Sequence, residues 1–258
     1  MTTAVLPGGV RRERAAIIGV LLAASAIAWA LVAWLSMDMD SDDEAMLTMG
    51  LGAPLFIATW ALMMAAMMLP AASPMVDAFI RIQSGRKASG GAYVPVTIFL
   101  AGYLLVWALV GVGAFAIARV LENQAMDHEW LMDNGARLGG VLIIAAGAYQ
   151  LSPLKSVCLG RCRTPMSFIV ESWRDGRLGA LRMGVQHGAF CFGCCWLLFA
   201  ILFPLGLMNV AIMAGVAAFV FIEKVLPGGV IASRAAAAVL LAYGTLVLFM
   251  PDALPAMM

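Results

Sequence analysis

Long, uninterrupted apolar runs dominate this chain and give the first indication of its fold. A bilayer core about 30 Å thick is crossed by roughly 20 apolar helical residues, whose backbone polar groups must be paired internally. Such runs occupy residues 15–36, 51–80, 93–118, 138–154, 183–203, 205–222 and 231–250. Since no segment alternates polar and apolar residues as a barrel strand would, we expect an all-α, polytopic transmembrane helix bundle of about seven spans.

The composition excludes a water-soluble globular protein. Of the 258 residues, 63% are hydrophobic and only 12% are charged, whereas about 25% are charged in an ordinary soluble domain. This number of charged side chains is too small to cover a surface of this size. Lipid must therefore be the solvent for most of the exterior. The net charge of +1 gives no indication of a nucleic-acid partner.

The charges are sorted among the connections between the apolar runs. Of the 16 Lys and Arg residues, all except Arg119 and Arg137 fall in alternate connections, together with the amino-terminal tail. Cytoplasmic connections carry this excess of cations. The pattern therefore predicts a basic cytoplasmic tail at residues 1–14, followed by a single transmembrane domain at residues 15–258 in a cell membrane.

The five cysteines all fall on the predicted cytoplasmic side or within spans, so a disulfide framework is not expected. His187, Cys191, Cys194 and Cys195 follow one another at helical offsets that place them on one face, within an arc of about 100°. Polar residues inside a membrane usually face the bundle interior and have a function. Free cysteine also packs as a small hydrophobe, but this concentration favours a metal or redox site.

A methionine cluster in the second apolar run lies at a similar predicted depth. Met63 and Met67 are one helical turn apart, and Pro70 and Pro74 should disturb the helix just beyond them. Methionine alone often fills irregular gaps in packing. Together with thiols and an imidazole, however, thioethers form a soft ligand set that favours Cu(I), with Zn(II) as the second choice.

Two further segments carry weaker indications of metal chemistry. Cys158 and Cys162 have a spacing at which both can bind one ion, although the pair is also compatible with two incidental thiols at a helix end. Residues 37–49 form an acidic, methionine-bearing loop that would attract cations, or that is simply solvated. Glu223 and Lys224 are interpreted as an interfacial ion pair or as two snorkelling side chains.

Five motifs in order resemble a known family. They lie at residues 60–70, 149–165, 187–196, 208–209 and 223–224. They are similar to those of bacterial and archaeal proteins described as predicted metal-binding integral membrane proteins of unknown function. The resemblance covers roughly residues 60–227 and implies a multi-pass protein of a bacterial or archaeal inner membrane with a metal site, without an established reaction. It does not assign a ligand at Phe199, where many relatives are expected to have methionine.

These patterns lead to one preferred function and two alternatives. The preferred function is soft-metal binding, with Cu(I) as the expected ion, for transport or for delivery to a membrane enzyme. The partners would then be a metal carrier or a membrane oxidase. The alternatives are a membrane thiol-disulfide oxidoreductase that uses Cys191 and Cys194, and a structural assembly subunit. Whether the chain is an enzyme stays open.

In the preferred function the predicted ligands form two groups. The residues of the midplane site are Met63, Met67, His187, Cys191, Cys194 and Cys195. Cys158 and Cys162 would exchange the ion on the cytoplasmic side. The chain has no P-loop motif, so the energy for any transport would come from a gradient or from a partner.

Overall fold

The computed structural model describes residues 8–37, 46–90 and 93–254. All regular secondary structure in these ranges is helical. The helices are α1 (Gly8–Met37), α3 (Ala53–Ala88), α4 (Val96–Asp127), α5 (Glu129–Gln150), α6 (Pro153–Arg163), α7 (Pro165–Ser172), α8 (Gly176–Ala200), α9 (Leu202–Leu205), α10 (Val210–Val225), α11 (Gly229–Phe249) and the short 3-10 helix η1 (Pro251–Ala253). The all-α prediction is confirmed. Residues 1–7 of the predicted tail and most of the acidic loop lie outside the described ranges.

The number of membrane-crossing helices is lower than the sequence predicted. Among the described residues, five helices are long and apolar enough to cross a membrane, or six if α5 and α6, which meet at a bend of 63°, form one broken span. The predicted span at residues 205–222 is largely α10, which has 16 residues. At 1.5 Å per residue it extends about 24 Å, which is short of the roughly 30 Å core of a bilayer. Seven spans are therefore not confirmed, although the structure is consistent with a multi-pass membrane protein.

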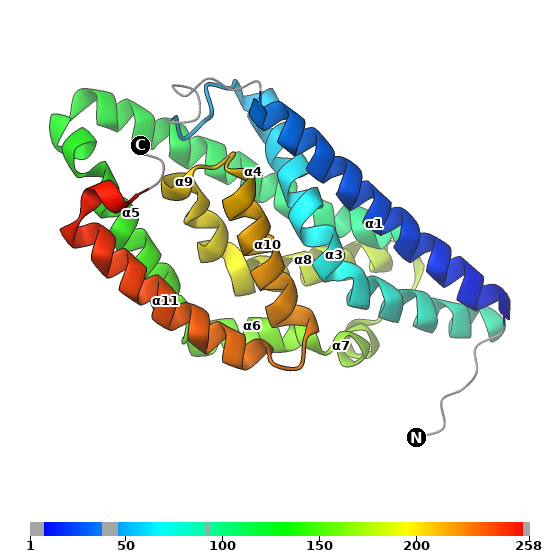
Figure 1. The fold of residues 1–258 in the computed structure, drawn as a ribbon. Helices are drawn as coiled ribbons and strands as arrows, with labels where there is room; N and C mark the ends of the chain where they lie inside the picture. The colour runs from blue at the N-terminus through cyan, green and yellow to red at the C-terminus, as the bar shows by residue number, and fades with distance from the viewer. Residues whose placement is uncertain (1–7, 38–45, 91–92, 255–258) are drawn as a thin grey trace.

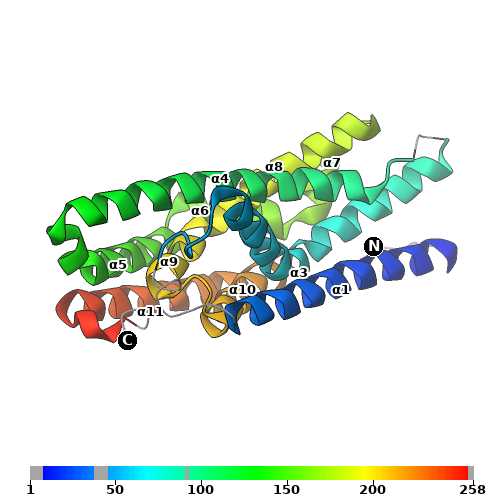
Figure 2. The ribbon, with the colours of Figure 1, turned by 90° about the horizontal axis from the view of Figure 1, so that it is seen from above.

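The helices pack in pairs around a central group. α1 packs on α3, α4 on α8, and α5 on α11, while α3 also contacts α4 and α6 contacts α8. Figures 1 and 2 show α1 and α3 at one side of the bundle, α5 and α11 at the other, and α8, α9 and α10 between them. The central position of α10 brings it into contact with α3, α6, α8 and α11.

The basic connections gather at one end of the bundle, which we call the basic end. The start of α1, α6, α7 and the turn from α10 to α11 lie at this end, opposite the connection from α4 to α5 (Figure 1). Within it, Asp77 pairs with Arg14 of α1 and, at 2.9 Å, with Arg81 of its own helix. The separation of charge along the sequence is thus also a separation in space.

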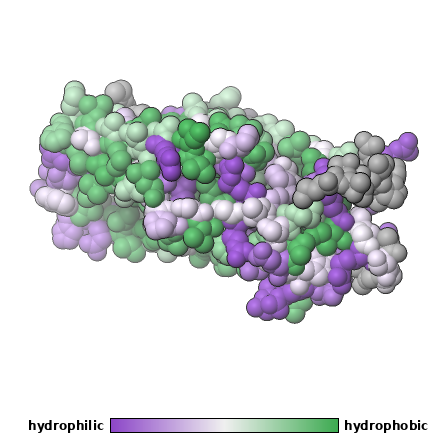
Figure 3. Space-filling model, turned by 90° about the horizontal axis from the view of Figure 1, so that it is seen from below, coloured by the Kyte–Doolittle hydropathy of each residue, from purple (hydrophilic) through white to green (hydrophobic). Residues whose placement is uncertain are grey.

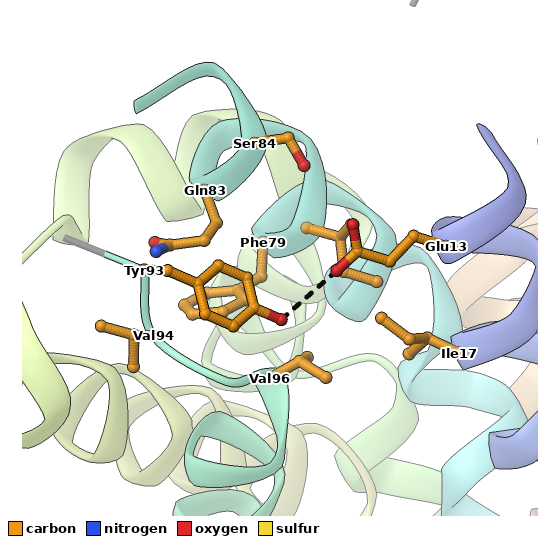
Figure 4. Close-up of a pocket in the computed structure, with 9 residues that line it drawn as sticks. Glu13, Ile17, Phe79, Gln83, Ser84, Tyr93, Val94 and Val96 are labelled. Atoms are coloured by element: carbon orange, nitrogen blue, oxygen red, sulfur yellow. Dashed lines mark hydrogen bonds between the residues drawn. The ribbon is translucent and has the colours of Figure 1, made fainter. Parts of the chain in front are cut away.

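A small cavity at the basic end lies between α1, α3 and the segment leading into α4 (Figure 4). The hydroxyl of Tyr93 reaches across it and donates a hydrogen bond to Glu13 Oε1 at 3.3 Å. Burial of the phenol and the neighbouring Glu13 carboxylate raise the pKa of Tyr93. This contact ties the start of α4 to α1.

The outer surface is rich in apolar side chains. Val20 and Ile27 of α1, Leu109 and Ile117 of α4, and Phe249 of α11 are all exposed. Figure 3 shows hydrophobic side chains over large parts of one face, with hydrophilic ones in separate groups. Apolar surface on this scale requires an apolar environment or a partner, and a lipid bilayer satisfies that requirement.

The helix α3 passes through two prolines without ending. Pro74 has no backbone N–H to donate to the carbonyl of Pro70, the residue one turn earlier. The hydroxyl of Ser73 donates to that carbonyl instead, at 2.7 Å. This local repair keeps α3 continuous from Ala53 to Ala88, so the methionines that precede Pro70 keep their helical spacing.

Glycines allow α4 and α8 to approach closely. A Cβ atom on Gly102 would overlap with the carbonyl oxygen of Leu181, and one on Gly184 would overlap with that of Phe99. Such overlap cannot be relieved by a side-chain rotation, because the atoms contacted belong to the backbone. The position of α8, which carries most of the cysteines, therefore depends on these two glycines.

We predict that Gly102→Ala lowers the stability of the protein by about 1–3 kcal/mol, because the added methyl group forces α4 and α8 apart. Gly113→Ala is the matched control on the same helix, since a Cβ atom there meets nothing within 4 Å. It should be neutral or slightly stabilising, because alanine favours a helix more than glycine does. Thermal unfolding of the purified variants in detergent measures the difference. Equal melting temperatures would contradict this account of the α4–α8 contact.

Candidate metal centre

The predicted polar face of α8 is buried in the bundle. His187, Cys191, Cys194 and Cys195 are each at most 3% exposed, and α8 contacts α4, α5, α6 and α10. All five cysteines of the chain are free. The three thiols and the imidazole of α8 therefore do not point outward at acyl chains.

The thiols of α8 are neighbours of one another. Cys194 Sγ and Cys195 Sγ donate to the carbonyl oxygen of Cys191, at 3.1 Å and 2.8 Å. The thiol of Cys195 also lies within hydrogen-bonding reach of the thiols of Cys191 and Cys194. One turn of α8 thus holds three sulfur atoms, and the protons on two of them, those of Cys194 and Cys195, are directed at the same carbonyl oxygen.

The helix α6 adds two more thiols to this group. The thiol of Cys162 lies within hydrogen-bonding reach of that of Cys194. Cys158 is half-buried beside α8, where a Cβ atom on Gly193 would lie 2.8 Å from its Sγ. Their spacing predicted a separate exchange site for these two cysteines, whereas in the structure Cys162 is a neighbour of the α8 thiols. We call the five residues Cys158, Cys162, Cys191, Cys194 and Cys195 the thiol chain.

A bend in the chain brings α6 to α8. Ser152 has an extended backbone and caps α6, since its hydroxyl accepts a hydrogen bond from the backbone N–H of Lys155 at 3.1 Å. Pro153 occupies the first turn of α6, where its lack of an N–H costs nothing. The resulting bend of 63° between α5 and α6 turns α6 across the basic end, so that Cys158 and Cys162 face α8.

Two polar groups contact Cys191 directly. Lys224 Nζ of α10 donates to Cys191 Sγ at 2.9 Å, and the hydroxyl of Tyr103 of α4 lies 3.2 Å from the same sulfur atom. Lys224 is buried, and a buried ammonium group requires a nearby counter-charge or strong hydrogen-bond partner. Sequence reasoning missed both contacts. For Lys224, the only features of the sequence that could have indicated its contact were its position at the end of an apolar run and its place in one of the family motifs.

The neighbouring Glu223 faces a different partner. Its carboxylate accepts two hydrogen bonds from Lys155 Nζ, at 2.7 Å and 2.9 Å, and a third from the hydroxyl of Ser233. Lys155 Nζ also donates to Gln150 Oε1. The interpretation of Glu223 and Lys224 as an interfacial pair or as snorkelling side chains was wrong, because both are buried and each binds a residue of another helix.

The methionines of α3 lie in the same core as the thiols. Met63 and Met67 are fully buried and belong to the hydrophobic cluster that also contains Cys162, Cys191 and Cys194. Their thioethers therefore belong to the same core as the thiols, and the similar depth that the sequence predicted for the two groups stays a prediction. Ligation by either sulfur atom stays a prediction.

His187 occupies an aromatic cage beside this core. Its ring stacks on Tyr103 with the centroids 5.2 Å apart and on Phe99 at 6.0 Å, and Phe168 lies 5.8 Å away in a tilted orientation. Neither ring nitrogen has a hydrogen-bond partner. Because an unpaired polar atom in an apolar interior is costly, the imidazole is available to a ligand that accepts its lone pair.

The donor atoms suit a soft ion, but they do not yet surround one. Among the described residues, no group of three or more His, Cys, Asp or Glu side chains is arranged to hold a metal ion. In the metal-free arrangement, the thiols of Cys194 and Cys195 instead donate to the Cys191 carbonyl oxygen. Binding of a metal ion would require these side chains to rotate toward a common point.

We predict that breaking the Lys155–Glu223 pair on one side destabilises the bundle more than removing it entirely. Glu223→Gln or Lys155→Met leaves a buried charge without its partner, which costs about 3–5 kcal/mol. The double variant Lys155→Met/Glu223→Leu buries no unpaired charge at these positions and should melt at a higher temperature than either single variant. Thermal unfolding provides the comparison, and a double variant no more stable than the singles would show that the pair does not stabilise the fold.

The comparisons with known proteins agree with this chemistry. Residues 57–247 match the model of the family described as PpoB2, copper chaperone. This range covers well over half of the chain and includes the thiol chain, Met63, Met67, His187 and Lys224. No curated protein and no solved structure matches the chain. The chain belongs to the PpoB2 copper chaperone family.

Proposed function

We propose that this copper chaperone family member binds Cu(I) inside a membrane-embedded helix bundle and passes it to a partner, by delivery to a membrane enzyme or by transport. One observation carries the proposal: thiols from α6 and α8 meet in the buried core, within the same hydrophobic cluster as Met63 and Met67 of α3. Cu(I) favours thiolate and thioether ligands over the oxygen ligands that suit Mg(II) or Ca(II).

Charge compensation supports a monovalent ion at this position. A Cu(I) ion held by two thiolates has a net charge of −1, which an apolar interior does not tolerate without a counter-charge. The ammonium group of Lys224, 2.9 Å from Cys191 Sγ, supplies that charge. Lys224 would therefore act as a positioning residue that keeps the loaded site neutral.

The order of the thiols supports a path for the ion. Cys158 is half-buried at the basic end, whereas Cys162, Cys191, Cys194 and Cys195 are buried. Cys158 lies beside Gly193, near Cys194, and Cys194 adjoins both Cys162 and Cys195, so an ion could move by exchange of one sulfur ligand at a time. Weak, successive sites of this kind permit both entry and release. In this scheme Cys158 receives Cu(I) from, or gives it to, a metal carrier.

Met63, Met67 and His187 would complete the site at its inner end. A neutral thioether adds a soft donor without adding charge, so it lowers the cost of holding the ion in an apolar core. The unpaired ring nitrogens of His187 offer a further neutral ligand. These assignments rest on donor chemistry and burial.

A second candidate function follows from the contact between Cys162 and Cys194. Oxidation of these two thiols would form one disulfide bond and release two electrons and two protons, which a quinone in the membrane could accept. This couple joins α6 to α8, and it replaces the couple of Cys191 and Cys194 that the sequence suggested.

The proposal predicts that the purified protein binds about one Cu(I) ion per chain under reducing conditions. Cys194→Ser should weaken binding by at least about tenfold, the scale on which even the loss of an outer partner of a metal ligand reduces affinity. Competition with a Cu(I) chelator measures the affinity. Unchanged copper binding would refute the role of the thiol chain. If maleimide trapping instead shows a quinone-dependent disulfide in metal-free protein, the second candidate is supported.

The methionines are tested by a substitution that preserves volume. Met63→Leu removes a thioether but keeps the packing, so it should fold normally and bind Cu(I) several-fold more weakly. Met132→Leu is the matched control, because Met132 is exposed on α5 far along the chain from the thiols. X-ray absorption of the loaded protein should show fewer sulfur neighbours of copper in Met63→Leu. Identical affinities and spectra would remove Met63 from the site.

A further inference from the structure

A cavity separate from the thiol chain lies at the basic end, between α6 and the start of α11. Its volume is about 390 Å³, and the residues that line it come from the end of α5, from α6 and from α11. None of the five cysteines lines it. Three cations do, Lys155, Arg163 and Arg234, and no acidic residue does.

The strongest sign of a ligand is a buried amide group that lacks a partner. Gln150 lines the cavity and is only 6% exposed. Its Oε1 atom is fixed toward Lys155, which has only donors to offer. Its Nε2 atom therefore keeps both N–H donors, and this atom has no hydrogen-bond partner. A buried donor without an acceptor is costly, so a ligand with acceptor oxygens would relieve it.

The three cations have different roles in this cavity. Lys155 gives its hydrogen bonds to Glu223 and Gln150, so its charge is compensated by Glu223 and its donors are already used. Arg163 is anchored to the carbonyl oxygens of Glu223 and, at 2.9 Å, Leu226. Arg234 is exposed and makes no hydrogen bond or ion pair with the described part of the chain. Its guanidinium group is therefore free to bind an anion in a bidentate manner.

The rim of the cavity is apolar. Leu151 and Val230 line it and are 58% and 53% exposed, and Leu154 and Ile231 next to them are exposed as well. A cationic interior beneath an apolar rim matches a phosphate group that carries an acyl chain. Basic pockets between transmembrane helices on the cytoplasmic side have this property.

We propose that this cavity binds a phosphate group, and that the rim favours the headgroup of an anionic phospholipid as its source. Arg234 and Gln150 Nε2 would donate to the phosphate oxygens, while Arg163, which is bonded only to backbone carbonyl oxygens, provides a positive field. The site is independent of copper, because none of its residues belongs to the thiol chain.

Native mass spectrometry of the full chain in detergent tests this site. The probes are dioctanoyl phosphatidylglycerol, dioctanoyl phosphatidylcholine and inorganic phosphate. The wild type should bind the anionic lipid more tightly than the zwitterionic one. Arg234→Gln should weaken binding of the anionic lipid about fivefold, which is the effect of one cation near a membrane surface. It should leave copper loading unchanged. Arg177→Gln is the matched control, because Arg177 is also exposed and makes no described hydrogen bond.

The outcomes separate the sources of the phosphate. If inorganic phosphate displaces the anionic lipid, the cavity recognises phosphate itself, and a free anion can occupy it. If only the anionic lipid binds in a manner that depends on Arg234, the apolar rim is part of the site. If Arg234→Gln and Arg177→Gln bind every probe alike, or if the two lipids bind equally to the wild type, water alone fills the cavity and the proposal is overturned.

Discussion

The need to pair buried charge organises the centre of this bundle. Two adjacent residues at the end of α10 point to different partners: Glu223 to Lys155 of α6, and Lys224 to the sulfur of Cys191 on α8. Since an unpaired charge in an apolar interior costs several kcal/mol, loss of either contact would strongly destabilise the fold. Through these two residues α10 fixes the positions of α6 and α8, and hence the distance between the thiols that each carries.

This arrangement explains why a short helix occupies the middle of the bundle. With 16 residues, α10 does not reach across a bilayer core, but its end at the basic side places Lys224 at the level of the cysteines. A longer apolar helix would carry its charged end beyond the core, where Lys224 would be solvated and could not donate to Cys191 Sγ. The length of α10 is thus matched to the electrostatics of the site, and Ser233 and Gln150 satisfy the remaining polar atoms around Glu223 and Lys155.

The sequence predicted those features that depend on local periodicity. The helical class, the burial of one face of α8 and the presence of Met63 and Met67 in the same core all follow from residue spacing. It did not predict the meeting of Cys162 with Cys194, because that contact depends on the bend at Ser152 and Pro153, which no periodicity encodes. The role of Lys224 was missed for a similar reason. A lysine at the end of an apolar run looks the same whether it snorkels to water or pairs with a buried sulfur.

The span count shows a further limit of hydropathy. The apolar run at residues 205–222 suggests an independent span, yet its helical part belongs to α10, whose buried side chains face neighbouring helices of the bundle. A helix enclosed by other helices is as apolar as one enclosed by lipid, so composition alone cannot separate the two environments.

The resting state of the thiols bears on how copper would be released as well as bound. Cys194 and Cys195 each give a hydrogen bond to the Cys191 carbonyl, and each bond contributes about 1 kcal/mol to the metal-free state. An ion that draws both sulfur atoms toward itself must replace these bonds, so part of its binding energy is spent on rotating the thiols. Releasing the ion restores them. A preformed cage would hold copper more tightly, whereas neighbouring thiols with an alternative acceptor favour exchange, which is the property that delivery requires.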